Sequence, residues 1–306
     1  MSYSHFHDQL ANGKIFVSDG AFGTMLLQSG FQTSECLEFL NLSHPELVRS
    51  ISEEYLKAGA DILHTNTFGA SPVKLKNYNL ENQTEAINRS AVNLIKEIAS
   101  EGIYISGSCG PSGKILKPFD NVSPDLLFQS FRRQIRVLVE SGIDLVTIET
   151  MSDIKEAIVA IKAARSISLE LPVLATMTFR RTPSGFFSNM GDDLRTSIQR
   201  LQDAGADVVG SNCGEGIREM VKLVREMRRF ATAPVMIQSN AGLPQLFDGE
   251  IIYPETPQLF TEQAGILLDL GVRIIGGCCG TTPDHIRAIR KVVDGAAGNV
   301  DIQASP

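Results

Sequence analysis

The chain has 306 residues, of which 43% are apolar and 21% are charged, as is usual for a globular protein. Its formal net charge of −7 gives no electrostatic basis for binding nucleic acid or an anionic membrane surface. No apolar run approaches the length of a membrane-spanning helix, and the first residues lack the basic and apolar regions of a signal peptide. The five cysteines are therefore expected as reduced thiols, and these properties favour a cytoplasmic enzyme.

Eight short apolar segments follow one another along the chain, and we predict that each contains one strand. In chain order they lie within residues 15–18, 59–67, 103–106, 142–150, 172–177, 205–213, 234–238 and 271–279. Every second segment, starting with 59–67, repeats one pattern. In that pattern a glycine suited to ending a helix precedes an apolar strand that finishes in polar residues.

The segments between these strands have helical periodicity. Isoleucines recur at helical spacing within residues 154–161, and residues 282–284 (Thr-Pro-Asp) are typical of a helix start. Eight strands that alternate with helices predict a single-domain α/β fold, the (β/α)8 or TIM barrel, over residues 1–295. An open doubly wound sheet is the alternative, but no Gly-x-Gly-x-x-Gly motif follows the first strand. Residues 296–306 are predicted to form a mobile tail.

The repeat predicts which residues share the mouth of the barrel, because active sites of such barrels lie at the C-terminal ends of the strands. Seven residues after each repeat glycine come Asn66, Glu149, Asn212 and Cys278. One residue further come Thr67, Thr150, Cys213 and Cys279. We expect these residues at one height, on alternate strands.

Cys213, Cys278 and Cys279 form the most informative group at this mouth. Glycines flank the adjacent pair, so the backbone can turn both sulfurs the same way. Three thiolates predict a zinc site with an open fourth position, although buried structural thiols are the alternative. Zinc in an electron-rich shell is a poor Lewis acid for hydrolysis, but it holds a further thiol as thiolate. The group therefore predicts alkylation of a thiol substrate.

Other residues at the strand ends are candidates for binding an amino-acid thiol. Asp19 and Glu149 could hold an ammonium group, and the amides of Gly20 and Ala21 could receive a carboxylate. A helix cap is the alternative role for Asp19, and a salt bridge is the alternative for Glu149. Asn240 could supply a fourth oxygen ligand to zinc or fix a loop.

Several further residues receive structural or secondary roles. His64 lies within an apolar strand and is interpreted as a core histidine. Cys36 is expected to pack in an insertion, and Cys109 to be an incidental thiol at a strand end. Four aromatic residues are expected near the rim, where they could surround an onium cation: Phe22, Phe68, Phe186 and Phe187.

Seven motifs together resemble the zinc-dependent homocysteine S-methyltransferase family over residues 10–295, and two of them resemble most the homocysteine-binding barrel of cobalamin-dependent methionine synthase. The motifs are Asp19-Gly-Ala-Phe-Gly-Thr24, Thr65-Asn-Thr-Phe68, Gly110-Pro111, Glu149-Thr150, Asn212-Cys213, Asn240-Ala-Gly-Leu-Pro244 and Gly276-Gly-Cys-Cys-Gly-Thr-Thr-Pro283. The resemblance implies a (β/α)8 barrel, zinc on Cys213, Cys278 and Cys279, and homocysteine contacts at Asp19, Gly20 and Glu149. It implies that homocysteine is methylated to methionine.

The methyl donor is left open among two hypotheses. A methylated corrinoid protein supplied as a separate chain fits the motifs, whereas S-methylmethionine or a betaine would let the chain act alone. A non-catalytic zinc-thiolate module that docks on a corrinoid partner is a different functional class, and a zinc hydrolase is a further alternative. The oligomeric state is left open as well.

Overall fold

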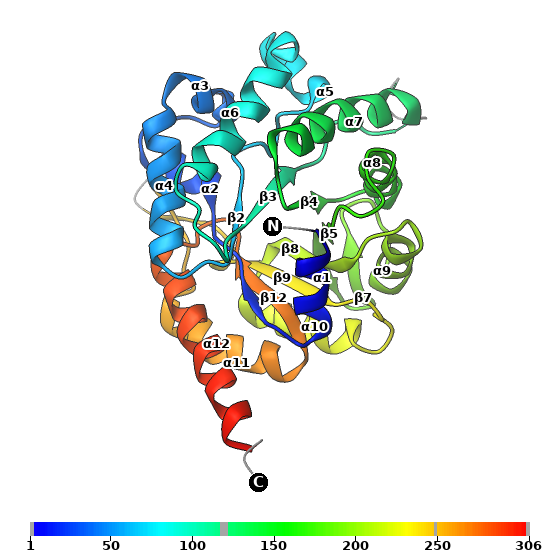
Figure 1. The fold of residues 1–306 in the computed structure, drawn as a ribbon. Helices are drawn as coiled ribbons and strands as arrows, with labels where there is room; N and C mark the ends of the chain where they lie inside the picture. The colour runs from blue at the N-terminus through cyan, green and yellow to red at the C-terminus, as the bar shows by residue number, and fades with distance from the viewer. Residues whose placement is uncertain (1–2, 117–121, 248–249, 304–306) are drawn as a thin grey trace.

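The computed structural model describes residues 3–116, 122–247 and 250–303, and its centre is a parallel sheet that closes into a barrel (Figure 1). Going round the sheet, the eight strands are β1 (Phe16–Val17), β12 (Val272–Gly277), β9 (Val235–Asn240), β8 (Val208–Gly216), β5 (Val173–Met177), β4 (Leu145–Met151), β3 (Tyr104–Cys109) and β2 (Ile62–His64). The parallel bridge between Ser18 and Ile62, with the bond from Asp19 N to Ile62 O (3.0 Å), joins β1 to β2. The predicted (β/α)8 barrel is therefore confirmed.

Helices follow each barrel strand and pack around its outer face (Figure 1). They are α2 (Phe22–Gln28), α3 (Leu40–Ser43) and α4 (Pro45–Lys57) after β1, α5 (Pro72–Leu75) and α6 (Thr84–Lys96) after β2, α7 (Pro124–Ser141), α8 (Ile154–Arg165), α9 (Leu194–Asp203), α10 (Ile217–Met227), α11 (Pro257–Asp269) and α12 (Pro283–Gln303). Short 3-10 turns cover Leu37–Phe39, Lys76–Tyr78 and Glu81–Gln83. Among the described residues, no helix combines the length and apolar composition needed to cross a membrane.

The four repeat glycines end helical segments, as the pattern predicted. Each ends the helical segment before its strand with a positive φ, which glycine adopts without strain: Gly59 (94°), Gly142 (90°), Gly205 (102°) and Gly271 (82°). At Gly142 this left-handed residue is the C-cap of α7. The four copies therefore enter the sheet in the same way, which keeps their polar ends in register.

The lower layer of the barrel interior is apolar and sealed by α1 (Tyr3–Ala11). Phe6 and Leu10 of α1 cluster with one buried residue from each barrel strand: Phe16, Ile62, Tyr104, Leu145, Leu174, Val208, Met236 and Ile274. The rings of Phe6 and Phe16 lie 5.1 Å apart, an ordinary packing distance. This end of the barrel is therefore filled and leaves the opposite end for a site.

Two residues further along the strands, the barrel interior becomes polar, because side chains of a strand alternate between its faces. His64 Nε2 lies 3.1 Å from Thr147 Oγ1, which lies 2.7 Å from Ser106 Oγ. On the other side, Gln238 Nε2 donates to Ser18 Oγ (3.2 Å). Of these buried residues, His64 and Gln238 line the cavity described below.

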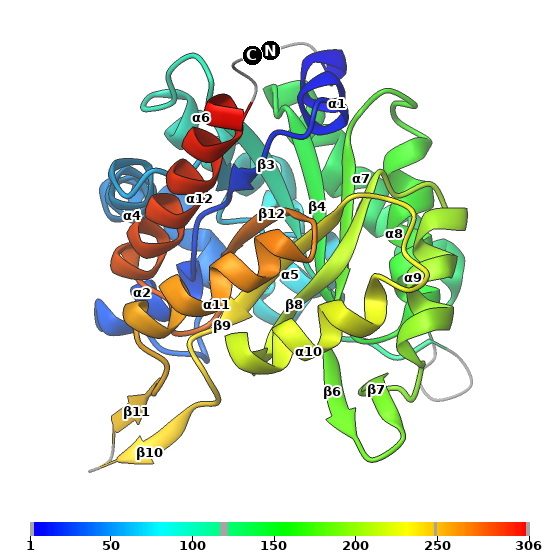
Figure 2. The same ribbon diagram turned by 90° about the horizontal axis from the view of Figure 1, so that it is seen from below.

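Two hairpins that the sequence did not predict project from the end of the barrel opposite α1 (Figure 2). One pairs β6 (Phe179–Thr182) with β7 (Gly185–Ser188), and the other pairs β10 (Gln245–Phe247) with β11 (Glu250–Ile252). Both are insertions between a barrel strand and its helix.

The last helix passes the expected end of the barrel. α12 continues to Gln303, so residues 296–303 of the expected tail are helical, and residues 304–306 lie outside the described residues.

Candidate functional site

The structure brings Cys213, Cys278 and Cys279 together at the mouth. Cys213 lies in β8, and the other two directly follow β12. Their sulfur atoms all lie within 4.8 Å of one another, with 3.9 Å between those of Cys213 and Cys279. Two thiolates bound to one zinc ion at the tetrahedral angle would lie about 3.8 Å apart. The spacing of the sulfurs therefore suits a single metal ion.

Local backbone geometry turns Cys213 toward the other thiols. Its φ is +59°, in the left-handed region that non-glycine residues seldom occupy, and the pairing of β8 with β9 shifts register after Asn212. Thr150, at the equivalent position of β4, has the same φ. Asn212 stabilises the bend at Thr150, since its side chain accepts a hydrogen bond from Thr150 N and donates one to Thr150 Oγ1 (2.7 Å each).

A tight turn holds the other two cysteines. Cys278 N donates to Ser239 O of β9 (2.7 Å), and Thr281 N donates to Cys278 O (3.0 Å). Gly280 has a φ of +78°, and a side chain there would strike the ring of Tyr253. Gly280 is therefore required both for the turn and for packing against Tyr253.

The three thiols share negative charge. Hydrogen bonds from Cys278 and Cys279 lower the pKa of Cys213 to about 3, and the bond to Cys213 raises the pKa of Cys278 well above its ordinary value. One thiolate is thus stabilised by two neighbouring thiols. A soft cation bound among the three sulfurs, in place of the protons they share, would allow all three thiols to ionise.

Asn240, at the end of β9 between the two cysteine-bearing strands, also faces this group. Its side chain makes a hydrogen bond that lowers the pKa of Cys213. Asn240 is 4% exposed, and among the described residues its Oδ1 has no hydrogen-bond partner. A buried carbonyl oxygen without a partner is costly, which makes Oδ1 a candidate ligand for a cation bound near the thiols.

A cavity of about 240 Å³ opens at the three sulfurs. Its wall includes Asp19, Gly20, Ala21, Phe22, Glu38, His64, Asn66, Phe68, Ser108, Glu149, Gln238 and the three cysteines. Of the aromatic residues expected at the rim, Phe22 and Phe68 line it, whereas Phe186 is buried in the core and Phe187 lies in β7.

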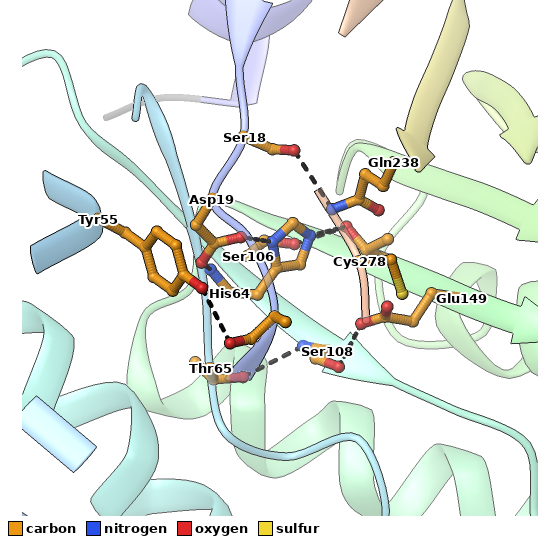
Figure 3. A network of polar contacts seen from close by, with 12 residues as sticks. Ser18, Asp19, Tyr55, His64, Thr65, Ser106, Ser108, Glu149, Gln238 and Cys278 are labelled. Carbon is orange, nitrogen blue, oxygen red and sulfur yellow. Dashed lines mark hydrogen bonds and ion pairs between the residues drawn. The ribbon is translucent and has the colours of Figure 1, made fainter. Parts of the chain in front are cut away.

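Glu149, in β4, lines this cavity, and its carboxylate points toward Ser108 (Figure 3). Ser108 Oγ donates to its Oε1 (2.5 Å), and Asn212 Nδ2 lies 3.4 Å from its Oε2. Burial raises the pKa of Glu149, partly offset by the charge of His64. No basic residue forms a salt bridge with Glu149 within the described part of the chain, so its carboxylate is available to a cation.

Asp19 is held by one residue. His64 donates to its two oxygens, from the backbone N (2.7 Å) and from Nδ1 (2.6 Å) (Figure 3). Because a carboxylate only accepts, Nδ1 carries the proton. The interpretation of His64 as a satisfied core histidine describes its burial, but it missed that the same ring lines the cavity and orients Asp19.

The turn after β1 is packed too closely at Gly20 to accept a side chain there. A Cβ on Gly20 would lie 2.7 Å from Thr281 Oγ1 and 2.9 Å from Tyr55 Oη. The Ala21 amide, expected to receive a carboxylate, donates instead to Thr281 Oγ1 (3.2 Å). The structure therefore places both residues on the cavity wall but gives the Ala21 N–H a partner within the chain.

The remaining thiols lie apart from this site. Cys109 is fully buried and donates to Gln134 Oε1 (3.3 Å), and burial raises its pKa strongly. Cys36 packs against Ala70, Leu75 and Ile87. Neither belongs to the three-sulfur group.

We expect His64 to make stability depend on pH. Burial alone would lower the pKa of His64, but the charge and hydrogen bond of Asp19 outweigh it, so the pKa lies above 6.5. A raised histidine pKa gives stability that is complete below the unfolded pKa and lost as pH rises through the folded pKa. The difference in unfolding free energy between wild type and His64→Gln should therefore be largest below pH ~6.5 and shrink at higher pH.

Urea unfolding across this pH range measures the effect. His285→Gln is a matched control, because burial lowers the pKa of His285 and the corresponding difference should grow with pH. A wild-type advantage over His64→Gln that grew with pH would contradict the assigned charge on His64.

Comparison with known proteins assigns the chain to a family. A family model described as homocysteine S-methyltransferase matches residues 16–293. Methionine synthases of Mycobacterium leprae and Mycobacterium tuberculosis are each 29% identical over 297 residues. Those matches cover 92% of this chain but 24% and 25% of the relatives, so the chain spans about a quarter of their length.

Solved structures agree with this fold. The metallated form of the homocysteine methyltransferase MmuM from Escherichia coli superposes with a TM-score of 0.76 at 22% identity, covering 93% of this chain and 98% of that one. A methyltransferase from Methanosarcina mazei has a TM-score of 0.60 at 12% identity, covering 93% and 94%. Since the family model extends over nearly all of the barrel, the chain belongs to the homocysteine S-methyltransferase family.

Proposed function

We propose that this protein transfers a methyl group to the thiol of homocysteine and forms methionine, with zinc held by Cys213, Cys278 and Cys279. The observation that carries the proposal is the meeting of three sulfurs within 4.8 Å at a cavity that also contains Asp19 and Glu149. Family membership supports the same reaction.

The donor set fits zinc. Three thiolates with a free fourth position are the pattern of a site that accepts an exogenous ligand, and Asn240 Oδ1, which has no partner among the described residues, is the proposed oxygen ligand when no substrate is bound. Zinc bound there would supply a Lewis acid that keeps a substrate thiol in its thiolate form at neutral pH. The N-terminus of α12 begins at Pro283, four residues after Cys279, and its positive dipole charge is expected to offset part of the charge of the thiolates.

The remaining residues would bind and orient the amino acid. Glu149 would accept hydrogen bonds from the ammonium group, held in position by Ser108 and Asn212. Asp19 would add a second negative charge while His64 fixes its plane. In the transfer, the homocysteine sulfur forms a bond to the methyl carbon as the bond from that carbon to the donor breaks, and the donor keeps the electron pair. No protein nucleophile is needed.

The proposed donor is a methylated corrinoid protein supplied as a separate chain. Support comes from the likeness to two methionine synthases and from the motifs at 65–68 and 240–244 that resemble the cobalamin-dependent enzyme.

A small onium donor is the second candidate, and one feature of the cavity favours it. Phe22, Phe68 and Glu38 line the wall together with the three sulfurs. Aromatic faces and a carboxylate attract a sulfonium or quaternary ammonium ion. S-methylmethionine and glycine betaine are the donors to test.

Replacing any one of the three cysteines by alanine should abolish methyl transfer and sharply lower zinc content, because two thiolates leave the ion incompletely held. Zinc per chain, measured by atomic absorption, and methionine formation are the measurements. Cys109→Ala is the matched control: it removes a buried thiol at another strand end and should leave both values unchanged. A triple alanine variant with full activity would refute the zinc mechanism.

Glu149→Gln should raise the KM for homocysteine about tenfold or more, because it removes a charged acceptor for the ammonium group. Zinc content should stay near that of the wild type, since Glu149 is not among the three ligands. Steady-state kinetics with parallel metal analysis tests this. Loss of zinc in the variant would reassign Glu149 to a structural role.

The donor is identified by measuring methionine formation from homocysteine by zinc-loaded protein with free methylcobalamin, S-methylmethionine or glycine betaine. Turnover with methylcobalamin alone is expected for a protein that uses a separate corrinoid carrier. Turnover with an onium donor would favour the second candidate. No turnover with any of the three, in a protein that retains zinc, would favour an unidentified donor protein or the non-catalytic zinc-thiolate module.

A further inference from the structure

The metal ligands come from strands that are not neighbours. Cys213 belongs to β8 and the cysteine pair follows β12, with β9 between them. Sheet pairing ends at Gly216 with Asn240 on one side and at Gly277 with Ser239 on the other. Cys213 lies in the unpaired stretch of β8 between Asn212 and Gly216, and Cys278 and Cys279 lie beyond Gly277, so the separation of the sulfurs also depends on contacts between the segments at these strand ends.

One residue contacts all three of these segments. Glu255, between β11 and α11, donates from its backbone N to Ala241 O after β9 (2.9 Å). Its carboxylate Oε2 accepts from Ile217 N, at the start of α10 after β8 (2.7 Å). Its backbone O lies 2.9 Å from Nε2 of His285, in the first turn of α12 after β12. Because that carbonyl only accepts, Nε2 carries the proton of His285.

These contacts extend to Cys279, one of the proposed metal ligands. Ala241 N donates to Cys279 O (3.0 Å), so hydrogen bonds connect Ile217, Glu255, Ala241 and Cys279 in sequence. Ile217 lies four positions after Cys213 in the same continuous stretch. The chain of bonds therefore joins the segment of Cys213 to the segment of Cys279 across β9.

The side chain of Glu255 replaces a missing helix cap. The N-cap of α10 is Gly216, which has no side chain to bond the first N–H groups of the helix. A Cβ at Gly216 would lie 2.3 Å from Glu255 Oε1, so the glycine makes room for this carboxylate. A negative group at a helix N-terminus is also favoured by the helix dipole.

From this arrangement we infer that Glu255 is a positioning residue for the three-thiolate site: its carboxylate ties the Cys213 segment to the segments of Asn240 and Cys279. The inference rests on the proposed zinc function. Glu255 does not line the substrate cavity, so its effect is expected on metal retention and not on homocysteine binding.

The test compares zinc release in three variants of the zinc-loaded protein. Glu255→Ala removes the carboxylate, Glu255→Asp shortens it by one methylene so that it no longer reaches Ile217 N, and Glu255→Gln keeps an acceptor oxygen at the same distance. We expect Ala and Asp to release zinc to a chromogenic chelator about tenfold faster than wild type, in the range typical of residues that support metal ligands. Gln should stay close to wild type.

Asp193→Ala is the matched control for lost helix capping. Asp193 caps α9 by accepting from Thr196 N (2.9 Å), and α9 holds no metal ligand. Both alanine variants should lose a similar amount of thermal stability, but only Glu255→Ala should release zinc faster. The thiolate charge-transfer bands of the cobalt-substituted protein should shift in Glu255→Ala and stay unchanged in Asp193→Ala.

Two outcomes would overturn the inference. One is zinc release from Glu255→Ala that is no faster than from Asp193→Ala. The other is release from Glu255→Gln as fast as from Glu255→Ala, since the hydrogen bond to Ile217 would then be irrelevant. If wild-type protein held no zinc on its cysteines, the proposed function would fail instead, and this is distinguishable because it is measured before any variant is compared.

Discussion

The site depends on the two-residue alternation of side chains in a closed parallel barrel. Alternation assigns every second residue of each strand to the interior, and closure stacks these residues in layers. In this protein the lowest layer is apolar and is sealed by Phe6 and Leu10. The next layer is polar and includes His64 and Thr147. The layer above ends in residues such as Glu149 and Cys278, at the open mouth.

Departures from this regular pattern occur where the chemistry requires them. Cys213 follows an inward residue and would point outward on a regular strand. Its left-handed φ and the shifted pairing of β8 with β9 turn it toward the cavity. Asn212, the preceding inward residue, bonds to the equivalent bend at Thr150. Two strand ends that flank β5 are thereby shaped together, and the cost of the strained φ is offset by these partly buried hydrogen bonds.

The sequence allowed the barrel and the cysteine group to be predicted because both depend on local pattern. Repeat glycines, apolar strands and polar ends lie within nine residues of each other in the chain, so spacing alone indicated their register. Contacts between distant residues left no such pattern. Asp19 and His64 are 45 positions apart, and Ile217 and Glu255 are 38 apart. The same limit explains Ala21, whose amide meets a hydroxyl 260 positions away. The two hairpins could not be predicted either, since they are insertions outside the repeating pattern of strands and helices.

The charges of the residues that line the cavity predict which ligands it favours. Glu38, Asp19, Glu149 and three cysteines line it, and its described lining contains no lysine or arginine. Such a cavity favours cations, which suits both a metal ion at the sulfurs and the ammonium group of an amino acid at the carboxylates. The carboxylate of that amino acid then has no lysine or arginine to bind, and both ring nitrogens of His64 are already engaged by Asp19 and Thr147. It must instead be held by backbone N–H groups or water, and the Ala21 amide is already bonded to Thr281. The proposed specificity for homocysteine would therefore come from its thiol and its ammonium group, with the carboxylate contributing less.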